Sequence, residues 1–417
     1  FTPRQPWPAG QVITVTLASG GLPAGWPALP LRQELRWWFE TVQPRLALLY
    51  PADGPADLYI YEPLAQQAVY RTRVPGGISD YDLLSGAPGG PRLYYAAPLP
   101  DGGGSRIYSL ALPAAVDADS SGPASDAAKA AAAATAAAAT GGPALLPAGE
   151  PLLDCPQAAC KALAVSPGGR YLAYERSAFP GQGETRPQVW YLPLDPTGGQ
   201  TAGSPALAGD PAHQTLLPDW SADDRLAFYD SDEAAFYLLR PADGDRLRLP
   251  NDTGQAGDWR PDSAAFLAPE ISFLPSGGGQ GLSGLERLAD SHLLLYDGRS
   301  GLPQDLTGEP GIEDAAPAYA PDGSRLAFAR KYLDVRRWTP GRQLWLTDLP
   351  AGRSRQLTAD PVYSHFDFAW SLDSQRLAFV RFNQSTLSEP PEVWIIDLQS
   401  GEFTRVLVGG YAPLWLP

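Results

Sequence analysis

The sequence predicts an all-β fold, a closed β-propeller, and three observations support this prediction. First, the phrase AYAPDGSRLAF at residues 318–328 returns one period later as AWSLDSQRLAF at residues 369–379. Second, each copy is followed by a short apolar run around Trp345 or Trp394 that ends in Asp-Leu. Third, a period of about 40–60 residues built from short β-like runs is typical of propellers, in which each repeat forms one blade.

Each unit has the same internal order. An apolar run leads into a Pro-Asp-Gly-type turn, then Arg-Leu-Ala-Phe, a variable loop and a second apolar run. Proline fixes φ, aspartate binds nearby backbone amides and glycine accepts positive φ, so this turn suits two antiparallel strands. The same order recurs at residues 165–174, 219–228 and 258–266, and less regularly at residues 81–110. Several consecutive blades are therefore predicted.

The two ends of the chain predict how the propeller closes. Residues 411–417 resemble an innermost strand with no continuation, whereas residues 45–50 and 58–61 resemble second and third strands with no first. A last blade completed by both termini would join them and remove exposed sheet edges. We expect seven blades of four antiparallel strands, with six as the alternative because residues 80–149 are irregular.

Residues 1–44 precede the predicted propeller, which covers residues 45–417. Within the first segment, residues 11–17 indicate a strand. Residues 31–42 indicate a short amphipathic helix, because Leu31, Leu35, Trp38 and Phe39 recur at helical spacing. This helix is expected either to pack on the propeller or to dock on a partner.

Two insertions interrupt the repeats. Residues 113–149 are of low complexity, and residues 127–139 are nearly pure alanine. Alanine favours a helix, but so short an isolated helix is marginal in water, so the segment is expected to be either a docked helix or a flexible tether. Residues 275–289 are glycine-rich and indicate a loop.

The repeats resemble the TolB-type propeller repeat, a relative of the WD repeat. The resemblance is strong over residues 160–417 and weaker over residues 45–112. It implies a periplasmic or surface-exposed propeller that often acts through protein contacts. The chain departs from TolB in leaving no room for an N-terminal α/β domain before the propeller.

Composition limits the partners and the location. With 31 basic and 46 acidic residues the net charge is −15, which argues against nucleic acid or an anionic membrane as a partner. No run of apolar residues is long enough for a membrane span. The sequence has no methionine, even at position 1. A processed, exported chain is therefore expected in the periplasm, outside the cell or on its surface; a lipid anchor before residue 1 stays open, and a truncated chain is the alternative.

Cys155 and Cys160 are the only cysteines, and they are separated by four residues. A disulfide is expected if the chain is exported, with two reduced thiols as the alternative. Two cysteines cannot supply the four ligands of a structural zinc site. No metal and no cofactor are predicted.

Motifs for catalysis are missing from the sequence. It has three histidines, no Gly-x-Ser-x-Gly elbow, no metalloprotease motif, no phosphate-binding loop and no dinucleotide fingerprint. His292 begins a predicted strand and is expected to be structural. His365 precedes a predicted innermost strand and is a candidate for a role at the mouth of the channel.

Carboxylates recur near the predicted innermost strands. A rim of acidic residues around the central channel would favour cations or basic peptides. The alternative is that each aspartate caps a turn or a strand end. The candidate rim, with the neighbouring histidine, comprises Asp80, Asp82, Asp219, Asp258, Asp314, His365 and Asp367.

Asn251 and Asn383 each begin an Asn-x-Ser/Thr sequon in a predicted loop, which makes them candidate glycosylation sites.

The leading functional hypothesis is a non-enzymatic, exported propeller that acts as a protein-interaction or scaffold module in a surface or envelope assembly. The second is a carbohydrate-binding or carbohydrate-acting propeller, because 12 tryptophans and 18 tyrosines could stack on sugars. The third is a structural subunit of a surface coat or filament.

Overall fold

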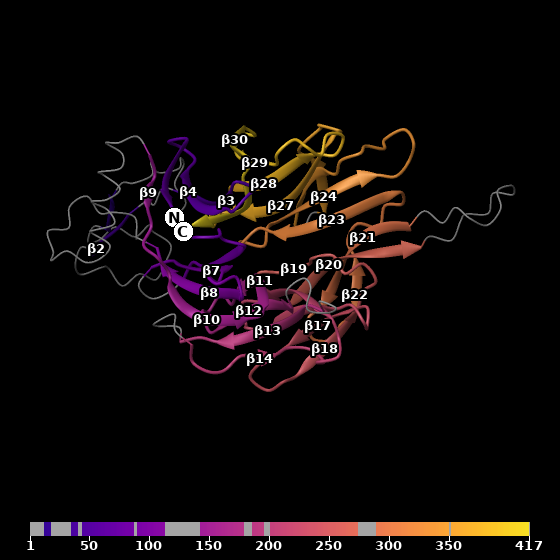
Figure 1. Ribbon diagram of the computed structural model, residues 1–417. Coiled ribbons are helices and arrows are strands. Elements are labelled where there is room, and N and C mark those ends of the chain that lie inside the picture. The colour runs from indigo at the N-terminus through magenta and orange to yellow at the C-terminus, as the bar shows by residue number, and fades with distance from the viewer. Residues whose placement is uncertain are drawn as a thin grey trace, which may run out of the picture.

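The computed structural model describes most of the chain, and every regular element in the described part is a β-strand (Figure 1). No described segment forms a helix with the length and hydropathy that crossing a bilayer requires. The described residues are 12–17, 35–40, 44–86, 90–112, 142–178, 186–195, 201–273, 289–349 and 352–416.

Four sheets contain four antiparallel strands each. The first is β6 (Asp80–Leu84), β7 (Arg92–Pro98), β8 (Gly104–Ala111) and β10 (Glu150–Pro156). The second is β11 (Ala158–Val165), β12 (Tyr171–Ala178), β13 (Gln188–Pro193) and β14 (Ala206–Leu207). The third is β15 (Thr215–Trp220), β16 (Leu226–Asp230), β17 (Ala235–Leu239) and β18 (Arg246–Pro250). The fourth is β27 (Tyr363–Trp370), β28 (Arg376–Asn383), β29 (Glu392–Asp397) and β30 (Phe403–Val408).

A five-stranded sheet joins the two ends of the propeller. Its order is β31-β3-β4-β5-β9, and in Figure 1 the yellow β31 lies beside the indigo β3. β31 pairs antiparallel with β3 from Arg45 opposite Leu416 onward, whereas β9 adds to the outer edge in parallel. The strands are β31 (Tyr411–Leu416), β3 (Arg45–Tyr50), β4 (Asp57–Glu62), β5 (Gln67–Arg71) and β9 (Ala144–Leu145).

The remaining propeller strands form one eight-stranded sheet. Its two halves meet where β21 and β23 pair in parallel at Ser291 and Glu313. The first half is β19 (Asp258–Trp259), β20 (Ala265–Phe273), β21 (Ala289–Asp297) and β22 (Pro303–Asp305). The second half is β23 (Ile312–Tyr319), β24 (Arg325–Tyr332), β25 (Gln343–Asp348) and β26 (Arg353–Gln356).

The all-β propeller is present, but the prediction of seven or six closed four-stranded blades is wrong. The described residues form five separate blades of four or five strands, and residues 258–356 form the eight-stranded sheet. None of these sheets closes on itself. The reason is the parallel pairing of Ser291 with Glu313, which merges two sequence repeats into one sheet and leaves no mark on the repeat pattern.

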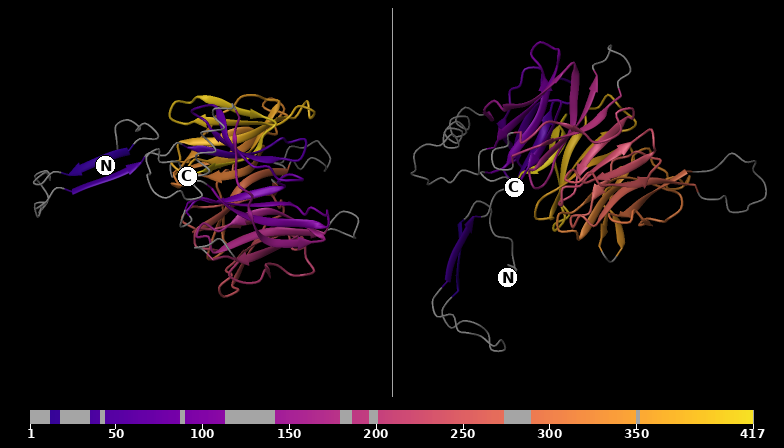
Figure 2. Two further views of the ribbon diagram at one scale, coloured as in Figure 1. Left: turned by 60° about the vertical axis from the view of Figure 1, so that its left-hand side comes forward. Right: turned by 90° about the horizontal axis from the view of Figure 1, so that it is seen from below.

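The predicted N-terminal helix is also wrong where the structure describes it. Leu35–Glu40 forms strand β2, which pairs antiparallel with β1 (Val12–Leu17). Aromatic residues such as Trp37, Trp38 and Phe39 favour strands. Their spacing in the sequence fits a helix as well as a strand, and pairing with β1 decides for the strand. Figure 2 shows that this pair lies apart from the propeller sheets.

The innermost strands share one irregularity. β11, β15, β23 and β27 each shift register against their neighbour near the middle of the strand. A residue with positive φ lies at each shift, as expected for a bulge. These residues, with the equivalent one in β31, are Ala162, Leu217, Ala316, Asp367 and Ala412.

The tryptophans of the repeat connect neighbouring units. Each lies near the end of an innermost strand and donates its indole N–H to a backbone carbonyl of the preceding innermost strand. The bonds run from Trp220 to Ala164 (2.9 Å), from Trp259 to Asp219 (3.4 Å), from Trp370 to Ala318 (3.0 Å) and from Trp415 to Ala369 (3.0 Å). The four side chains are only 5–8% exposed, so little of their surface is available for stacking on a ligand.

The arginine of Arg-Leu-Ala-Phe makes a second connection between units. Arg225 donates to the carbonyls of Ser263 and Gly298, and Arg325 donates to that of Ser374 at 3.1 Å. In each case an acceptor lies in the turn of the next unit. The repeated phrase therefore encodes contacts between sheets as well as strands.

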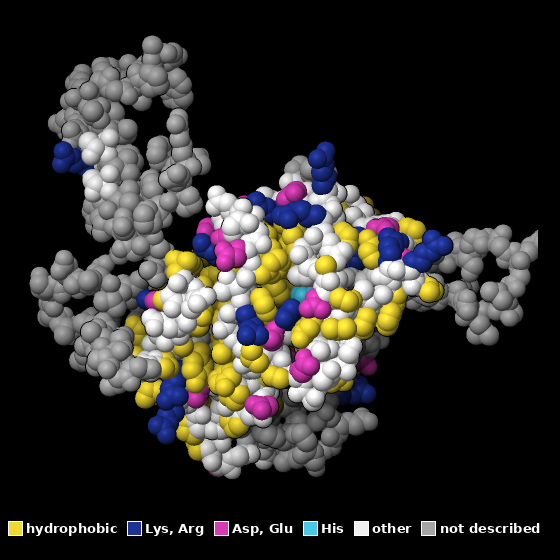
Figure 3. Space-filling view, turned by 90° about the horizontal axis from the view of Figure 1, so that it is seen from above, with side chains coloured by type: hydrophobic (Ala, Val, Ile, Leu, Met, Phe, Trp, Pro, Cys, Tyr) yellow, Lys and Arg dark blue, Asp and Glu magenta, His cyan; other side chains and the backbone are white. Residues whose placement is uncertain are grey.

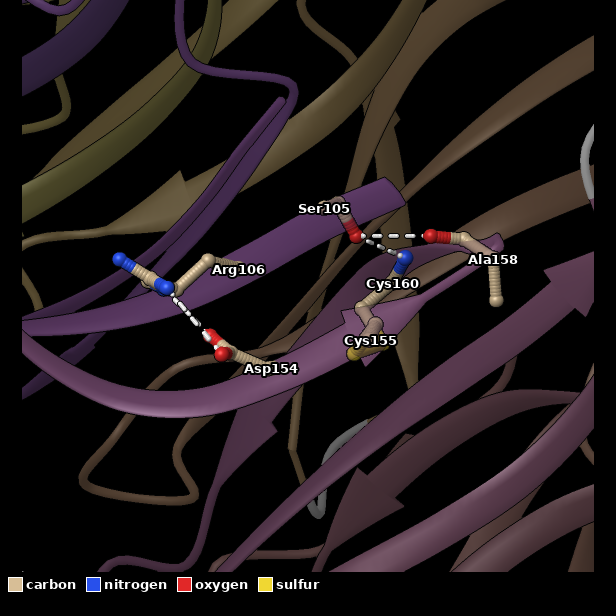
Figure 4. Close-up of a disulfide and its surroundings, with 6 residues drawn as sticks. All are labelled: Ser105, Arg106, Asp154, Cys155, Ala158 and Cys160. Carbon is tan, nitrogen blue, oxygen red and sulfur yellow. Dashed lines mark hydrogen bonds and ion pairs between the residues drawn. A yellow bond between two sulfur atoms is a disulfide. The ribbon is translucent and has the colours of Figure 1, made fainter. Parts of the chain in front are cut away.

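A disulfide joins Cys155 at the end of β10 to Cys160 in β11 (Figure 4). Beside it, the hydroxyl of Ser105 accepts a hydrogen bond from the Cys160 amide at 2.7 Å and donates to the carbonyl of Ala158. Asp154, on the same strand as Cys155, pairs with Arg106 of β8. The crossing from one sheet to the next is thus held covalently and by hydrogen bonds.

Candidate functional site

Three of the predicted rim aspartates line one cavity of about 750 Å³. The cavity is formed by the innermost strands of neighbouring units. Asp219 comes from β15, Asp258 from β19 and Asp367 from β27. These residues are distant in sequence, so the propeller fold brings their carboxylates together.

The same cavity has an aromatic wall that the sequence analysis did not identify. Phe366 and Phe368 flank Asp367 in β27, and Tyr319 contributes from β23. The signal in the sequence was the pattern Phe-Asp-Phe at the point where the inner strand bulges. The cavity therefore combines negative charge with apolar surface.

Backbone amides hold these aspartates in place. Asp258 accepts a hydrogen bond from the amide of Tyr319 at 2.5 Å, and Asp219 accepts one from the amide of Trp220 at 2.9 Å. The Asp367 carboxylate, which is exposed to the cavity, also accepts a backbone hydrogen bond from Ala412. Two of these three bonds come from the innermost strand of the next unit, so the aspartates also serve the fold.

Asp80 and Asp82 of β6 have the same arrangement beside β11. Asp80 accepts a hydrogen bond from the amide of Leu163, and Asp82 accepts one from Val165, both at 2.6 Å. They do not line the cavity of the other three. Asp80 nonetheless interacts electrostatically with one of the three, because its negative charge contributes to the raised pKa of Asp367.

Burial raises the pKa of all five carboxyls. It raises the pKa of Asp82 to about 7 and that of Asp80 and Asp367 to about 6. For Asp219 and Asp258 burial is again the main cause of the raised pKa, and the charge of Asp258 raises that of Asp219 further. These carboxyls therefore take up protons at a higher pH than a free aspartate does, and a bound cation would favour release of the protons.

The structure places Asp314 away from the cavity. Its carboxylate is fully buried (0% exposed) and forms two hydrogen bonds with Arg330, at 2.6 and 2.8 Å. Asp314 lies before the bulge of β23, in register with Arg330 of β24. It does not belong to an acidic rim.

His365 is likewise not at the channel. It is 1% exposed, and its Nδ1 lies 2.9 Å from the carbonyl of Arg342. Burial lowers the pKa of His365 to about 4. The residue lines a separate cavity of about 210 Å³ between β26, β27 and the outer strands of that unit.

The other two histidines bind carboxylates. His213 contacts Asp230 at 2.8 Å, and His292 contacts Asp305 at 2.7 Å. Among the described residues no serine, threonine or cysteine side chain is hydrogen-bonded to a histidine, so none forms the nucleophile and base of a hydrolase. The described part of the chain also contains no group of three or more potential metal ligands.

Both sequon asparagines are buried, at 1% exposure for Asn251 and 9% for Asn383. The amide nitrogen of Asn251 donates to the carbonyl of Pro269, and that of Asn383 donates to Glu389. Since a glycan would be attached to this nitrogen, the fold protects both sites.

The surface has mixed character despite the net negative charge. Figure 3 shows basic and acidic side chains interspersed with hydrophobic ones over one face. Many arginines pair with nearby carboxylates, for example Arg381 with Glu392 at 2.8 Å.

Comparison with known proteins gives one curated relative and several structures. No family model matches the chain. The uncharacterized peptidase YuxL of Bacillus subtilis is 28% identical over 116 residues, which are 27% of this chain and 17% of the relative. A puromycin-hydrolyzing peptidase of Mycobacterium tuberculosis has a TM-score of 0.53 at 13% identity, with 90% of this chain and 52% of that chain covered. TolB from Acinetobacter baumannii has a TM-score of 0.46 at 14% identity, with 90% and 83% covered.

These comparisons correct the functional hypothesis drawn from the sequence. The expectation of a non-enzymatic interaction or scaffold module is wrong, because the relative that shares sequence with the chain is a peptidase and peptidases are among the proteins that share its fold. The chain spans 17% of the length of the curated relative and 52% of the peptidase structure. The likeness in structure concerns the fold, a propeller with TolB-like proteins among its neighbours.

Proposed function

We propose that this chain is the substrate-selecting propeller of a peptidase, and that its central cavity receives the positively charged part of a peptide. The observation that carries the proposal is the convergence of Asp219, Asp258 and Asp367 on one cavity of about 750 Å³. A cavity of this size accommodates a ligand of a few residues. The sequence match with a peptidase supplies the class of enzyme.

The chemistry of the cavity favours a cationic ligand. A lysine side chain or an N-terminal ammonium group bound between Asp219 and Asp258 would lower the raised pKa of these carboxyls, which would then release their protons to solvent. The cation then interacts with carboxylates in a partly desolvated channel, where attraction is stronger than in water. Phe366 and Phe368 provide apolar contacts for the adjoining part of the peptide.

In this proposal the propeller selects and admits the substrate, and hydrolysis uses groups other than the described residues. The histidines that the structure describes contact Asp230, Asp305 and a backbone carbonyl, and none contacts a hydroxyl nucleophile. Binding and turnover must therefore be measured separately. The ligand assay reports on the cavity, and the hydrolysis assay reports on the enzyme class.

Calorimetric titration of the purified chain with tetrapeptides that differ in one central residue tests the cavity. A lysine peptide should bind more tightly than its norleucine and glutamate counterparts, and added salt should weaken its binding. Replacing Asp219 and Asp258 together by asparagine should weaken lysine-peptide binding by about tenfold, since the variant loses a cation–carboxylate attraction of about 1.4 kcal/mol. Equal affinity for the three peptides would overturn the selection of cations.

A matched control is the exposed loop residue Asp243, which pairs with Arg240 and does not line the cavity. Its replacement by asparagine should leave peptide affinity unchanged.

Release of 4-nitroaniline from lysyl and glutamyl nitroanilides by the native protein tests the enzyme class. Binding of no peptide at all, or turnover that ignores charge, would refute the assigned role.

Two finer assignments complete the proposal. Membership of the TolB-type propeller group is supported by the repeated Arg-Leu-Ala-Phe and tryptophan positions. An exported location is supported by the disulfide between Cys155 and Cys160, because disulfides persist in oxidising compartments. Recovery of the endogenous protein with both thiols free, by alkylation before reduction, would exclude that location.

A further inference from the structure

A second cavity, separate from the channel, has a volume of about 210 Å³. It lies between the connection from β26 to β27 and the strands β28, β29 and β30. None of the residues that line it lines the acidic cavity. Its lining is Leu357, Thr358, Ala359, Asp360, His365, Phe379, Arg381, Trp394 and Phe403.

His365 presents one open polar atom to this cavity. Its Nδ1 lies 2.9 Å from the carbonyl of Arg342, and because a carbonyl can only accept, Nδ1 must carry the proton. Nε2 is then the unprotonated acceptor of the ring. Among the described residues no donor contacts this atom, although the side chain is 1% exposed. An acceptor at the wall of a largely apolar cavity is suited to a ligand that brings a donor.

Two other polar side chains of the lining already have hydrogen-bond partners. Arg381 binds Glu392 at 2.8 Å and Asp360 at 3.4 Å. The hydroxyl of Thr358 accepts from the amide of Leu344 and donates to a side-chain oxygen of Gln343. Nε2 of His365, by contrast, has no hydrogen bond to another described residue.

The walls are aromatic. The ring of Phe379 lies 5.6 Å from that of His365, and Trp394 and Phe403 complete the apolar surface. Arg381 stacks on Trp394 at 4.4 Å from the ring centroid, which keeps the indole in position. A flat aromatic guest would bury its faces against these rings.

We propose that this cavity binds a phenol-sized aromatic group whose hydroxyl donates to Nε2 of His365. The size agrees, because a cavity of about 150 Å³ already accommodates benzene. Arg381 and Asp360 place opposite charges in the lining and pair with each other, so neither a cation nor an anion is favoured over a neutral donor. The same chemistry is offered by a free phenol and by a tyrosine side chain of a peptide.

Titration of the purified chain with p-cresol, toluene, benzylamine and benzoate, followed by NMR, tests this proposal. The affinity for p-cresol should exceed that for toluene by about tenfold, the typical net value of one hydrogen bond. Benzylamine and benzoate should bind more weakly than p-cresol. Equal affinities for p-cresol and toluene, or preference for a charged ligand, would overturn the proposal. N-acetyltyrosinamide distinguishes the two sources, because tighter binding than p-cresol identifies a peptide tyrosine as the guest and weaker binding identifies a free phenol.

Two variants separate the hydrogen bond from the cavity itself. His365→Asn keeps a donor for the carbonyl of Arg342 but removes Nε2, so it should abolish the preference for p-cresol over toluene. Ala359→Trp, at an exposed position of the rim, should block both ligands while leaving His365 intact. Retention of p-cresol binding by Ala359→Trp would place the ligand elsewhere and refute the proposal, even if His365→Asn failed to fold.

Discussion

Trp415 offers the sharpest test of how the units are held together. It lies in β31, the strand that pairs with β3, and it is 5% exposed. Its indole N–H donates to the carbonyl of Ala369 in β27 at 3.0 Å. One side chain thus connects the sheet that joins both ends of the propeller to the sheet before it.

The size of the effect follows from these contacts. Trp415→Phe keeps an aromatic ring but removes the donor, so the buried carbonyl of Ala369 loses a partner at a cost of about 1–3 kcal/mol. Trp415→Ala also leaves a cavity, and burial this complete predicts a loss of about 3–5 kcal/mol. Against a total stability of about 5–15 kcal/mol for a folded domain, the alanine variant should be visibly destabilised.

Guanidinium unfolding followed by far-UV circular dichroism measures these losses without relying on tryptophan fluorescence. Trp338, which is 55% exposed, provides the control, and Trp338→Ala should change the free energy of unfolding by less than about 0.5 kcal/mol. If Trp415→Ala and Trp338→Ala unfolded at the same denaturant concentration, the bond to Ala369 would not hold the units together.

Two further predictions concern charge and covalent structure. Burial raises the pKa of Asp82 from 3.8 to about 7, so the folded chain keeps a proton that the unfolded chain releases; the resulting stability is full below pH 4 and is lost as the pH rises toward 7. Asp82→Asn should therefore remove about 2 kcal/mol of the stability difference between pH 5 and pH 8, measured by thermal unfolding at both values, and an unchanged pH dependence would contradict this. Cys155→Ser should cost about 2 kcal/mol, as expected for a short closed loop, and reductant should destabilise only the chain in which Cys155 is linked to Cys160.

The sequence predicted the strands of the repeat because their pattern has a local cause. Arg-Leu-Ala-Phe follows a turn and continues as a buried strand, as in β24 (Arg325–Tyr332). Which strands pair with one another depends on residues that are distant in the sequence, and the local pattern carries no information about them. Leu35–Glu40 therefore looked helical until its pairing with β1 was known, and the merging of two repeats at Ser291 and Glu313 could not be foreseen.

The candidate site was predicted in part for a similar reason. Asp219, Asp258 and Asp367 do converge, because innermost strands surround the channel. Asp314 and His365 occupy the same place in their strands, each two residues before the residue with positive φ at the register shift. The bulge interrupts the alternation of side chains, so a count of alternate residues does not tell which face those two positions take.

The hydrogen bonds from tryptophan to carbonyl give the units of β15 and β27 a donor at one side and an acceptor at the other. Such head-to-tail contacts specify which face of a unit meets which face of the next, but no individual contact counts the units. The number of units must then follow from the angle between successive sheets, which is distributed over many packed side chains. This explains why a repeat can be recognised in a sequence although the number of units in the propeller cannot.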